Sequence, residues 1–445
     1  MTDKQAESQP AVVPARAKQA GEASARWSWV EPSVWTARML AALDQGVQGG
    51  KWFSLIDKVY SRRNLEAAWH QVRRNRGSAG VDHITVEEFT AHLETNLASL
   101  SDLLRESQYR PQSIRRVWIS KTGSSEKRPL GIPTVRDRVV QAALVHVLEP
   151  IFERDFAEHS YGFRPKRGTK SALRRVWKLL QSGSFWVVDA DLRSYYDTIP
   201  HQRLMDRIEE KISDSRVLDL IRAFLVQEVL ESAEAWSPEE GTPQGAVLSP
   251  LLSNIYLNPL DHHMASLGFE MVRYADDFVI LCRSEGEARR ALSEVESWTV
   301  ELGLRLHPDK TRIVDARQAG GFDFLGYHFE RGYRWPSKKS LGKHKEAIRA
   351  VTRRTNGKSL REIIAKVNAK RRGWFEYFKH SHKTTFGRLD EWVRMRLRSI
   401  LRKRHGRKGR GRGNDHQRWP NAFFAEQGLF SYVTALAQLR QSSRR

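Results

Sequence analysis

The residues best suited to chemistry are two adjacent carboxylates, Asp276 and Asp277, in the segment Tyr274-Ala275-Asp276-Asp277. Apolar, strand-prone residues flank this segment at 271–272 and 278–281. The pattern predicts two strands joined by a tight turn. Carboxylates beside such apolar strands are costly unless a cation neutralises them, and hard oxygen ligands suit Mg²⁺. The simpler alternative is an ordinary Asp-rich hairpin turn. The choice between a magnesium site and such a turn depends on acidic residues elsewhere in the chain.

A second acidic pattern lies at 185–192, where an aromatic and β-branched run leads to Asp189 and Asp191. Alternation along a strand puts both on one face, so Asp189 is either a neighbour of the site or the partner of an arginine. Phosphoryl transfer to a 3′-hydroxyl uses two Mg²⁺ ions about 3.5–4 Å apart. Asp191 together with Asp276 and Asp277 supplies carboxylates for such a pair, which favours a magnesium site over an ordinary turn.

Both helices and strands are expected among the elements that position these carboxylates. Residues 50–110 have a helical pattern, 112–133 a strand and loop pattern, and 136–156 a long helical pattern. The acid-bearing strands lie within 185–281, separated by helices, and a basic, helical region follows residue 332.

Composition limits the class of protein. The 445 residues are 40% hydrophobic, enough for two or three domains of a globular chain. The sequence contains no run of about 18 apolar residues, so no membrane span is expected. Residues 1–25 are polar and lack the apolar core of a signal peptide, so a disordered or loosely packed leader is expected over 1–45. The single cysteine, Cys282, excludes a disulfide framework and fits a buried core position in a reducing, cytoplasmic setting.

The charge is unevenly distributed. The net charge is +23, yet residues 331–445 hold 32 Lys and Arg against 7 Asp and Glu, a net of +25. A region this basic repels itself without a polyanionic partner, so it predicts nucleic-acid binding better than a merely solvated face.

Two helices are expected within this basic region. The first begins at a capping box, Ser359 to Glu362. The second places Arg394, Arg398 and Arg402 at i, i+4 and i+8, opposite an apolar face, as a row able to follow a phosphate backbone.

The chain resembles the bacterial group II intron-encoded reverse transcriptases and maturases from about Asn64 to its end. Eight motifs occur in the family's order: RNRGSAGVD (74–82), KRPLGIPTVRDRVVQ (127–141), SYGFRPKRGTKSA (160–172), DADLRSYYDTI (189–199), GTPQGAVLSPLLSNIYL (241–257), RYADDFVIL (273–281), GLRLHPDKT (303–311) and FDFLGYHF (322–329). The resemblance implies an α+β right-hand polymerase, with helical fingers, a palm of antiparallel strands and helices, and a helical basic thumb. It implies fingers and palm over 46–335, a thumb or maturase X domain over 336–405, and a basic DNA-binding tail over 406–445.

The resemblance also implies roles for individual residues near the reaction. Asp191, Asp276 and Asp277 match the catalytic metal-binding triad, and Leu192 would offer its carbonyl to the second ion. Tyr196 matches the aromatic gate beneath the sugar of the incoming nucleotide, although the family more often has Phe; its simpler role is a core aromatic. Gln244 and Gly245 match residues that line the nascent base pair.

Further residues are implied in substrate binding. Lys121 and Arg128 are candidates for the triphosphate, and Arg164 and Lys166 for the template; each pair has the alternative of being ordinary surface charges. Lys310 resembles a lysine near the departing pyrophosphate, with a general-acid role. A further segment, Phe324-Leu325-Gly326-Tyr327, matches the primer grip.

The activity implied is RNA-templated DNA synthesis with two Mg²⁺ ions, for which Mn²⁺ can substitute, combined with binding of an intron RNA to promote splicing. The implied partners are group II intron RNA, target DNA, an RNA template with a DNA primer, and dNTPs, in a bacterial cytoplasmic ribonucleoprotein. The alternatives are a splicing cofactor without polymerase activity and a domesticated, defence-associated reverse transcriptase. The single cysteine leads us to expect no HNH endonuclease of the cysteine-paired kind.

Overall fold

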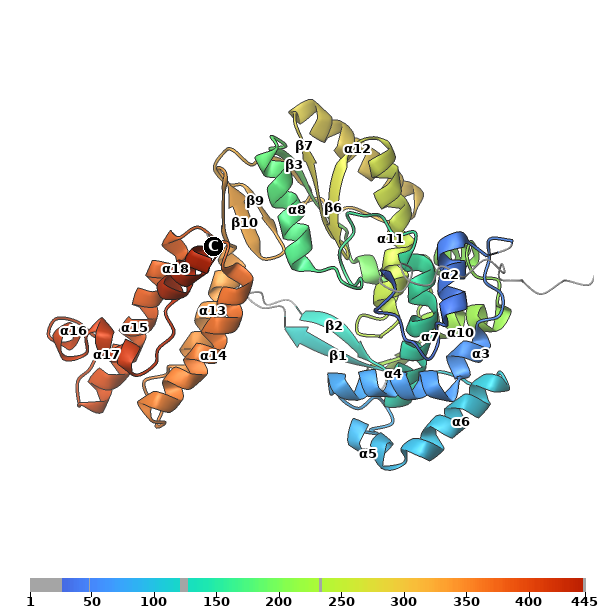
Figure 1. The fold of residues 1–445 in the computed structure, drawn as a ribbon, viewed down its shortest axis with the longest axis horizontal. Helices are drawn as coiled ribbons and strands as arrows, with labels where there is room; N and C mark the ends of the chain where they lie inside the picture. The colour runs from blue at the N-terminus through green and yellow to red at the C-terminus, as the bar shows by residue number, and fades with distance from the viewer. Residues whose placement is uncertain (1–25, 48, 121–126, 232–233, 443–445) are drawn as a thin grey trace, which may run out of the picture. The chain divides into compact units, whose positions relative to one another are not determined.

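A computed structural model describes residues 26–47, 49–120, 127–231 and 234–442 (Figure 1). Its contacts divide the chain into two compact units. The first takes in most of the chain up to residue 313, and the second takes in residues 179–187 and everything from 314 onward. Both contain helices and antiparallel strands, so the prediction of an α+β fold is confirmed.

The first unit is mainly helical. Its helices are α2 (Ala37–Gln45), α3 (Ile56–Tyr60), α4 (Arg62–Asn75), α5 (Val86–Ala91), α6 (Leu93–Arg105), α7 (Val135–Glu153), α8 (Thr169–Gln181, which runs into the second unit), α9 (His201–Glu209), α10 (Ser215–Leu225), α11 (Ser249–Ser266) and α12 (Glu285–Glu301). The central helix α7 is buried along most of its length and packs against α3, α4 and α11.

The expected leader is partly structured. Residues 1–25 lie outside the described residues, but 26–45 are folded onto the first unit. Trp27 and Trp35 are buried, and the Trp35 indole donates a hydrogen bond to the carbonyl of His146 in α7 (2.8 Å). The prediction of a loose leader over 1–45 is therefore wrong for its second half, because two indoles pack there.

Two sheets belong to the expected fingers and palm. One has the strand order β2-β1-β4-β5, formed by β1 (Ile114–Ser120), β2 (Lys127–Ile132), β4 (Val229–Glu231) and β5 (Glu234–Trp236). The other has the order β6-β7-β3-β8, formed by β3 (Trp186–Asp191), β6 (Glu270–Tyr274), β7 (Asp277–Cys282) and β8 (Arg312–Asp315). Helix α11 packs against β6 and α12 against β7, and both helices lie beside this sheet in Figure 1. Cys282 ends β7 as a buried residue, which confirms it as a core position.

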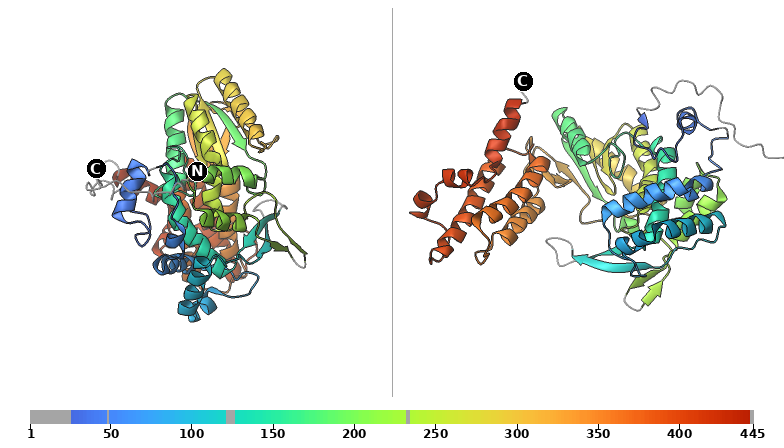
Figure 2. Two further views of the ribbon diagram at one scale, coloured as in Figure 1. Left: turned by 90° about the vertical axis from the view of Figure 1, so that its right-hand side faces the viewer. Right: turned by 60° about the horizontal axis from the view of Figure 1, so that its bottom comes forward.

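The second unit combines a small sheet with helices, seen in orange and red in Figure 2. The sheet has the order β11-β10-β9, formed by β9 (Phe322–Phe324), β10 (Tyr327–Glu330) and β11 (Tyr333–Pro336). The helices are α13 (Lys338–Val351), α14 (Leu360–Phe378), α15 (Thr384–Arg404), α16 (Asp415–Arg418), α17 (Asn421–Glu426) and α18 (Tyr432–Ser442). The predicted capping box at Ser359 and Glu362 is present at the start of α14.

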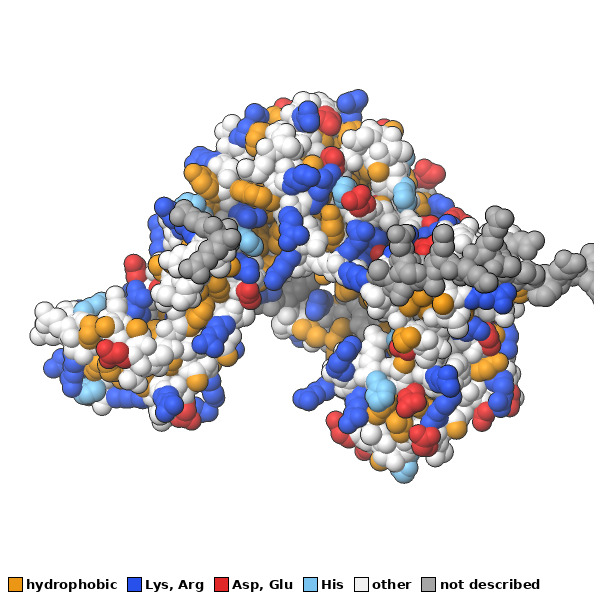
Figure 3. All heavy atoms as spheres, viewed as in Figure 1, with side chains coloured by type: hydrophobic (Ala, Val, Ile, Leu, Met, Phe, Trp, Pro, Cys, Tyr) orange, Lys and Arg blue, Asp and Glu red, His pale blue; other side chains and the backbone are white. Residues whose placement is uncertain are grey.

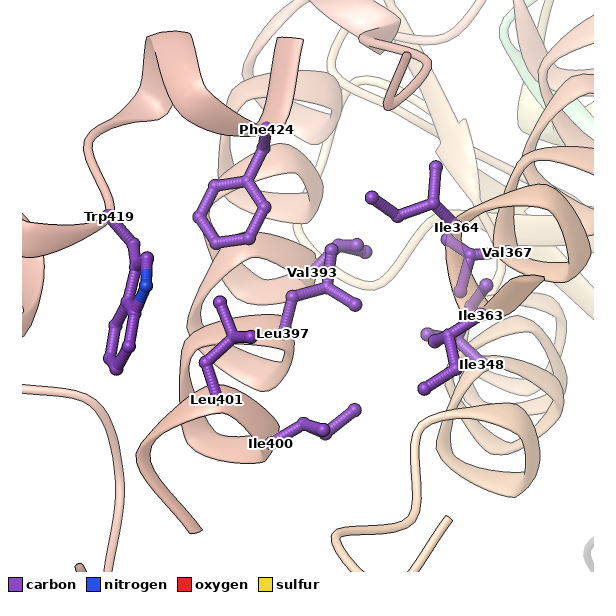
Figure 4. Close-up of a cluster of buried hydrophobic side chains, with 10 residues drawn as sticks. All are labelled: Ile348, Ile363, Ile364, Val367, Val393, Leu397, Ile400, Leu401, Trp419 and Phe424. Carbon is purple, nitrogen blue, oxygen red and sulfur yellow. The ribbon is translucent and has the colours of Figure 1, made fainter. Parts of the chain in front are cut away.

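The C-terminal segment is part of this helical unit. Trp419 and Phe424 enter one apolar cluster with Ile348 of α13, Val367 of α14 and Leu397 of α15 (Figure 4). Tyr432 enters a second cluster. The expected boundary at 405/406 is therefore not a break in packing, because the C-terminal segment supplies aromatic side chains to the core of the second unit.

Candidate active site

The Asp-bearing hairpin forms as predicted. Strands β6 and β7 pair antiparallel with Tyr274 opposite Asp277, so only Ala275 and Asp276 lie in the turn. Ala275 has a φ of 60°, the left-handed conformation that a two-residue hairpin turn uses. Buried apolar residues on both strands hold the hairpin in the sheet.

A buried arginine fixes the turn from beneath. The Arg273 guanidinium has no solvent exposure and donates to both carboxylate oxygens of Asp261 (2.5–3.0 Å) and to the side-chain oxygen of Asn254 (3.0 Å). It also donates to the carbonyl of Ala275 (2.8 Å), inside the turn itself. Arg273 therefore ties the backbone next to Asp276 to helix α11, which carries Asn254 and Asp261.

A glycine lets a second loop close on the turn. Any side chain at Gly162 would run into the backbone of Tyr274 and Ala275, and the Gly162 carbonyl accepts a hydrogen bond from Asn254 (2.8 Å). Sequence patterns did not identify these supports of the site, which are Gly162, Asn254, Asp261 and Arg273. Gly162, Asn254 and Arg273 lie inside quoted motifs, but only the fold shows that they meet.

Asp191 comes to the hairpin from the neighbouring strand. It is the last residue of β3, which lies next to β7 in the sheet. Burial raises the pKa of Asp276, and the Asp191 carboxylate raises it further. Burial also raises the pKa of Asp277 to about 7, with added repulsion from Asp276, Asp189 and Asp191. The three acids thus lie close enough for their charges to repel one another.

Two cations lie against the β3 carboxylates. The Lys310 ammonium is 2.6 Å from Asp191 Oδ2, and the Arg312 guanidinium is 3.2 Å from Asp189 Oδ2. Of the two alternatives for Asp189, the structure thus shows an arginine pair, and Asp189 also acts on Asp277. The negative charge of Asp276 is only partly balanced. Arg273 and Lys310 lower its pKa, but burial keeps the pKa raised.

The donor set fits a divalent cation in charge and chemistry. Among the described residues, no three Asp, Glu, His or Cys side chains are already gathered as a metal centre. In addition, the Lys310 ammonium occupies the Asp191 carboxylate that a cation would need. The pKa values of Asp276 and Asp277 are nevertheless raised, and a bound Mg²⁺ would stabilise such hard carboxylate oxygens in the charged form.

Leu192 and Tyr196 follow Asp191 along the chain. Leu192 is buried and forms a bridge with Leu306, using the Asp191 carbonyl and the Arg193 amide. The Tyr196 ring packs edge-on against Tyr195, with centroids 5.4 Å apart, and burial and the Asp276 charge raise its pKa. Tyr196 thus lies within electrostatic reach of the hairpin.

A cavity of about 520 Å³ adjoins these residues in the first unit. Its lining includes Tyr196, Asp197, Gln244 and, from the β2-β1-β4-β5 sheet, Gly131 and Trp236. The Gln244 side chain donates to Asp197 (3.2 Å). The next residue, Gly245, has a φ of 112°, and a side chain there would lie 2.5 Å from the Gly131 carbonyl. The loop therefore depends on glycine to approach β2.

The other predicted contacts of the first unit differ in exposure. Lys121 lies outside the described residues, and Arg128 is exposed on β2. Arg164 is buried; it pairs with Glu153 (2.7 Å) and donates to the carbonyls of Ala157 and Ser160. The prediction that Arg164 contacts template is wrong, because its donors are used inside the protein. Lys166 donates to the Ser28 hydroxyl of the N-terminal segment (2.7 Å).

The predicted primer grip forms a tight hairpin within the second unit. Phe324 and Tyr327 end β9 and begin β10, while Leu325 and Gly326 make the turn with φ values of 46° and 81°. The hydroxyls of Tyr327 and Tyr377 donate to the carbonyls of Tyr377 and Leu325, respectively. The hairpin is therefore anchored to α14.

The predicted arginine row on α15 is only partly correct. Arg394 is half-buried on the helix surface, but Arg398 is 4% exposed and donates to the Trp419 carbonyl and the Asn421 side chain. Arg402 pairs with buried Asp415 (2.5 Å). The sequence pattern could not show that the C-terminal segment folds back over this row and uses two of its cations.

The arginines of this row should therefore respond differently to mutation. We expect Arg394→Gln to reduce the salt dependence of RNA binding by about one slope unit, because one phosphate contact is lost. We expect Arg398→Gln to leave the slope unchanged and to lower the melting temperature, because buried acceptors lose their donor. Filter binding over a salt series and thermal melts measure the two effects. A reduced salt slope in Arg398→Gln, without a lowered melting temperature, would instead support the predicted phosphate-binding row.

A sheet flanked by helices, in which an acid-tipped strand lies beside an acid-bearing antiparallel hairpin, is the arrangement of a nucleic-acid polymerase palm. Residues 119–329 match the family described as "Reverse transcriptase (RNA-dependent DNA polymerase)", and 341–419 match "Group II intron, maturase-specific domain". The chain belongs to the group II intron-encoded reverse transcriptase and maturase family, as the resemblance predicted.

Two curated relatives agree with this assignment. The chain is 32% identical to Protein YkfC of Escherichia coli over 346 residues, covering 69% of this chain and 86% of YkfC. It is 36% identical to the group II intron-encoded protein LtrA of Lactococcus lactis over 269 residues, covering 58% of this chain and 43% of LtrA. Among solved structures the chain is similar to a chain of a "Partial Cas6-RT-Cas1--Cas2 complex", with 25% identity, a TM-score of 0.36 and coverage of 56% of this chain and 41% of that chain.

Within the described residues, no helix is both long and apolar enough to cross a membrane.

Proposed function

We propose that this protein copies RNA into DNA with two divalent metal ions held by Asp191, Asp276 and Asp277. The observation that supports the proposal is the sheet order, in which β3, ending at Asp191, lies next to β7, whose hairpin with β6 carries Asp276 and Asp277. Mg²⁺ ions bound there, or Mn²⁺ in their place, would activate the primer 3′-hydroxyl and stabilise the departing pyrophosphate.

The chain's own residues then have positioning tasks. Asp191 and Asp277 on the strands and Asp276 in the hairpin turn would hold the cations, and the carbonyl of Leu192 would add a further oxygen donor. Binding of divalent cations to Asp191 would displace the Lys310 ammonium from this carboxylate. Lys310 would then lie near the departing pyrophosphate. The distance of 2.6 Å between its ammonium and Asp191 Oδ2 supports this role.

The incoming dNTP would be recognised by residues around the cavity of the first unit. Tyr196 and Gln244 line it, and Gly245 brings the backbone close to β2. Arg128, exposed on β2, and Lys121 nearby in sequence would meet the triphosphate. The hairpin at 324–327 would hold the primer, and Lys166 the template.

We expect Tyr196→Ala to raise incorporation of ribonucleotides relative to deoxyribonucleotides by about tenfold or more, because the ring that would clash with a 2′-hydroxyl is lost. Tyr196→Phe keeps the ring and should leave the preference unchanged. Single-nucleotide extension with matched rNTP and dNTP measures the ratio. An unchanged ratio in Tyr196→Ala would make Tyr196 a core aromatic only.

The maturase-specific domain supports a second role in the same protein. The helices of the second unit carry the chain's excess of Lys and Arg, and blue basic side chains outnumber red acidic ones on the part of this unit seen in Figure 3. Such a surface suits binding of folded intron RNA through its phosphates. We propose that the protein binds its group II intron RNA to promote splicing and then copies it at a DNA target, as a cytoplasmic bacterial ribonucleoprotein.

The test separates the two roles. Purified protein should extend a DNA primer on an RNA template with Mg²⁺ or Mn²⁺, and EDTA should stop extension. The same preparation should accelerate splicing of the intron RNA encoded around its reading frame. Splicing without primer extension would indicate a splicing cofactor that lacks polymerase activity. Primer extension by a protein whose reading frame has no flanking intron would favour the domesticated, defence-associated alternative.

A further inference from the structure

The outer face of the three-stranded sheet in the second unit carries aromatic rings that the core does not use. Directly paired residues of antiparallel strands share a face, so His328 and Trp335 lie on one side and Phe329 on the other. Phe322, Phe324 and Phe329 form the inner, fully buried face. The outer face carries His328, Tyr333 and Trp335.

These rings gather into one surface, which we call the aromatic platform: His328, Tyr333, Trp335 and His382. Tyr333 lies 5.6 Å from Trp335 and 4.9 Å from His382, measured between ring centroids, and His328 lies 6.5 Å from Trp335. The His382 amide donates to the carbonyl of Arg334 (2.8 Å), which fixes this loop against β11. The platform is thus preorganised by backbone pairing.

The platform is open to solvent. Tyr333 is 53% exposed, and Trp335, His328 and His382 are half-buried. Burial of an aromatic side chain contributes strongly to folding, and Tyr333 obtains only part of this contribution. An exposed large aromatic side chain in contact with other rings is a feature of interaction sites rather than of cores.

Exposed cations flank the platform along the sequence: Arg331, Lys338, Lys339 and Lys383. Two further cations nearby are used elsewhere, because Arg334 pairs with Phe329 and lies on the inner face, and Lys379 pairs with Glu376 (2.8 Å). The acids on this face are Asp323 and Glu330, and both are engaged by the His328 ring, at 2.7 and 3.1 Å. Glu330 also meets Arg331 at 3.6 Å. Exposed cations next to the rings in sequence, together with acids that are already paired, suit a polyanionic partner.

Open rings beside cations match one chemistry in particular. Unpaired nucleotides offer flat bases that stack on aromatic rings and phosphates that pair with Lys and Arg. A duplex offers the phosphates but keeps its bases stacked inside. We propose that the aromatic platform binds unpaired nucleotides of a single-stranded nucleic acid, with a base stacked on Tyr333 and phosphates near Lys338 and Lys339. This site goes beyond the proposed polymerase, since it needs neither the aspartates nor a nucleoside triphosphate.

Photocrosslinking tests the location directly. The full-length protein, without metal or dNTP, is irradiated with a hexamer of RNA carrying 4-thiouridine or a hexamer of DNA carrying 4-thiothymidine, and the crosslinked peptides are identified by mass spectrometry. We expect crosslinks to Tyr333, Trp335 or His382. Stronger labelling by RNA would assign the site to RNA, and stronger labelling by DNA to a DNA strand. Crosslinks found only outside 328–335 and 379–383 would overturn the proposal.

Variants separate stacking from charge. Tyr333→Ala and Trp335→Ala should each weaken hexamer binding about tenfold with an unchanged salt slope, because a stacked base is lost and no phosphate contact is. Lys338→Gln and Lys339→Gln should each reduce the slope by about one unit. Tyr333→Phe keeps the ring and should bind like the wild type, and Val433→Ala, which shortens another half-exposed apolar side chain of the same unit, serves as control.

Two results would reject the site even if every variant folds. One is equal binding of the hexamer by Tyr333→Ala, Trp335→Ala and wild type. The other is displacement of the hexamer by a hairpin duplex as effectively as by unlabelled single strand. Failure of the wild type to extend primers would contradict the proposed polymerase function. It would not affect the test of the aromatic platform, because the crosslinking assay involves no DNA synthesis.

Discussion

Asp276→Asn is expected to abolish primer extension, with a fall of at least about 10³-fold, while RNA affinity changes less than about twofold. An amide is a weaker ligand for a hard cation and removes one of the charges that would hold it, a loss of about 4 kcal/mol or more in the transition state. RNA binding depends on phosphate contacts elsewhere, so it does not need this carboxylate. Primer extension and RNA filter binding on the same preparation measure the two effects.

The fold itself should not lose stability in this variant. Burial and the Asp191 charge raise the pKa of Asp276, so the ionised carboxylate is disfavoured in the folded protein. An uncharged amide removes that repulsion, and the melting temperature without divalent ions should hold or rise. Asp189→Asn is the matched control, because Asp189 lies on the same strand as Asp191 and pairs with Arg312; we expect it to cost less than about tenfold in extension. Equal loss of RNA affinity and extension in Asp276→Asn would contradict the assignment.

Local sequence patterns predicted the parts of this protein that local physics determines. The hairpin at 274–277 follows from the apolar, strand-prone runs that flank a short turn, and the helix at Ser359 follows from its cap. Both acid-bearing strands were identifiable because each apolar run is bounded by carboxylates. Their approach to one another came from the family resemblance, since nothing in the spacing of residues 191 and 276 requires β3 to lie beside β7.

The failures share a physical cause. Sequence alone suggested surface positions for Arg164, Arg398 and Arg402. In the structure, each of these arginines instead binds a carboxylate or a carbonyl of another segment of the protein. A charged side chain can be buried only when a partner is supplied, and the partner is visible only in three dimensions. The prediction of a loose leader over 1–45 is wrong at residues 26–45 for the same reason, because the partner of Trp35 is the carbonyl of His146 on α7, distant along the chain.

Arg273→Met is the variant for which we expect the largest loss of stability near the site. It removes all the hydrogen bonds that the Arg273 side chain makes and leaves the Asp261 carboxylate buried without its cation. Breaking a buried ion pair in this way costs about 3–5 kcal/mol. A melting temperature lowered by several degrees, with loss of primer extension, is the expected result. Met approximates the volume of the arginine stem, so the loss should reflect the polar contacts.

The double variant Arg273→Met/Asp261→Leu distinguishes packing from positioning. Replacing both members of a buried pair by apolar side chains is often neutral, so much of the lost stability should return. The Ala275 carbonyl still lacks the Arg273 donor, and the turn carrying Asp276 is no longer held at that point. We therefore expect melting to recover while extension stays at least about tenfold below wild type. Full recovery of both would show that Arg273 serves only the fold, and that the hairpin positions its aspartates unaided.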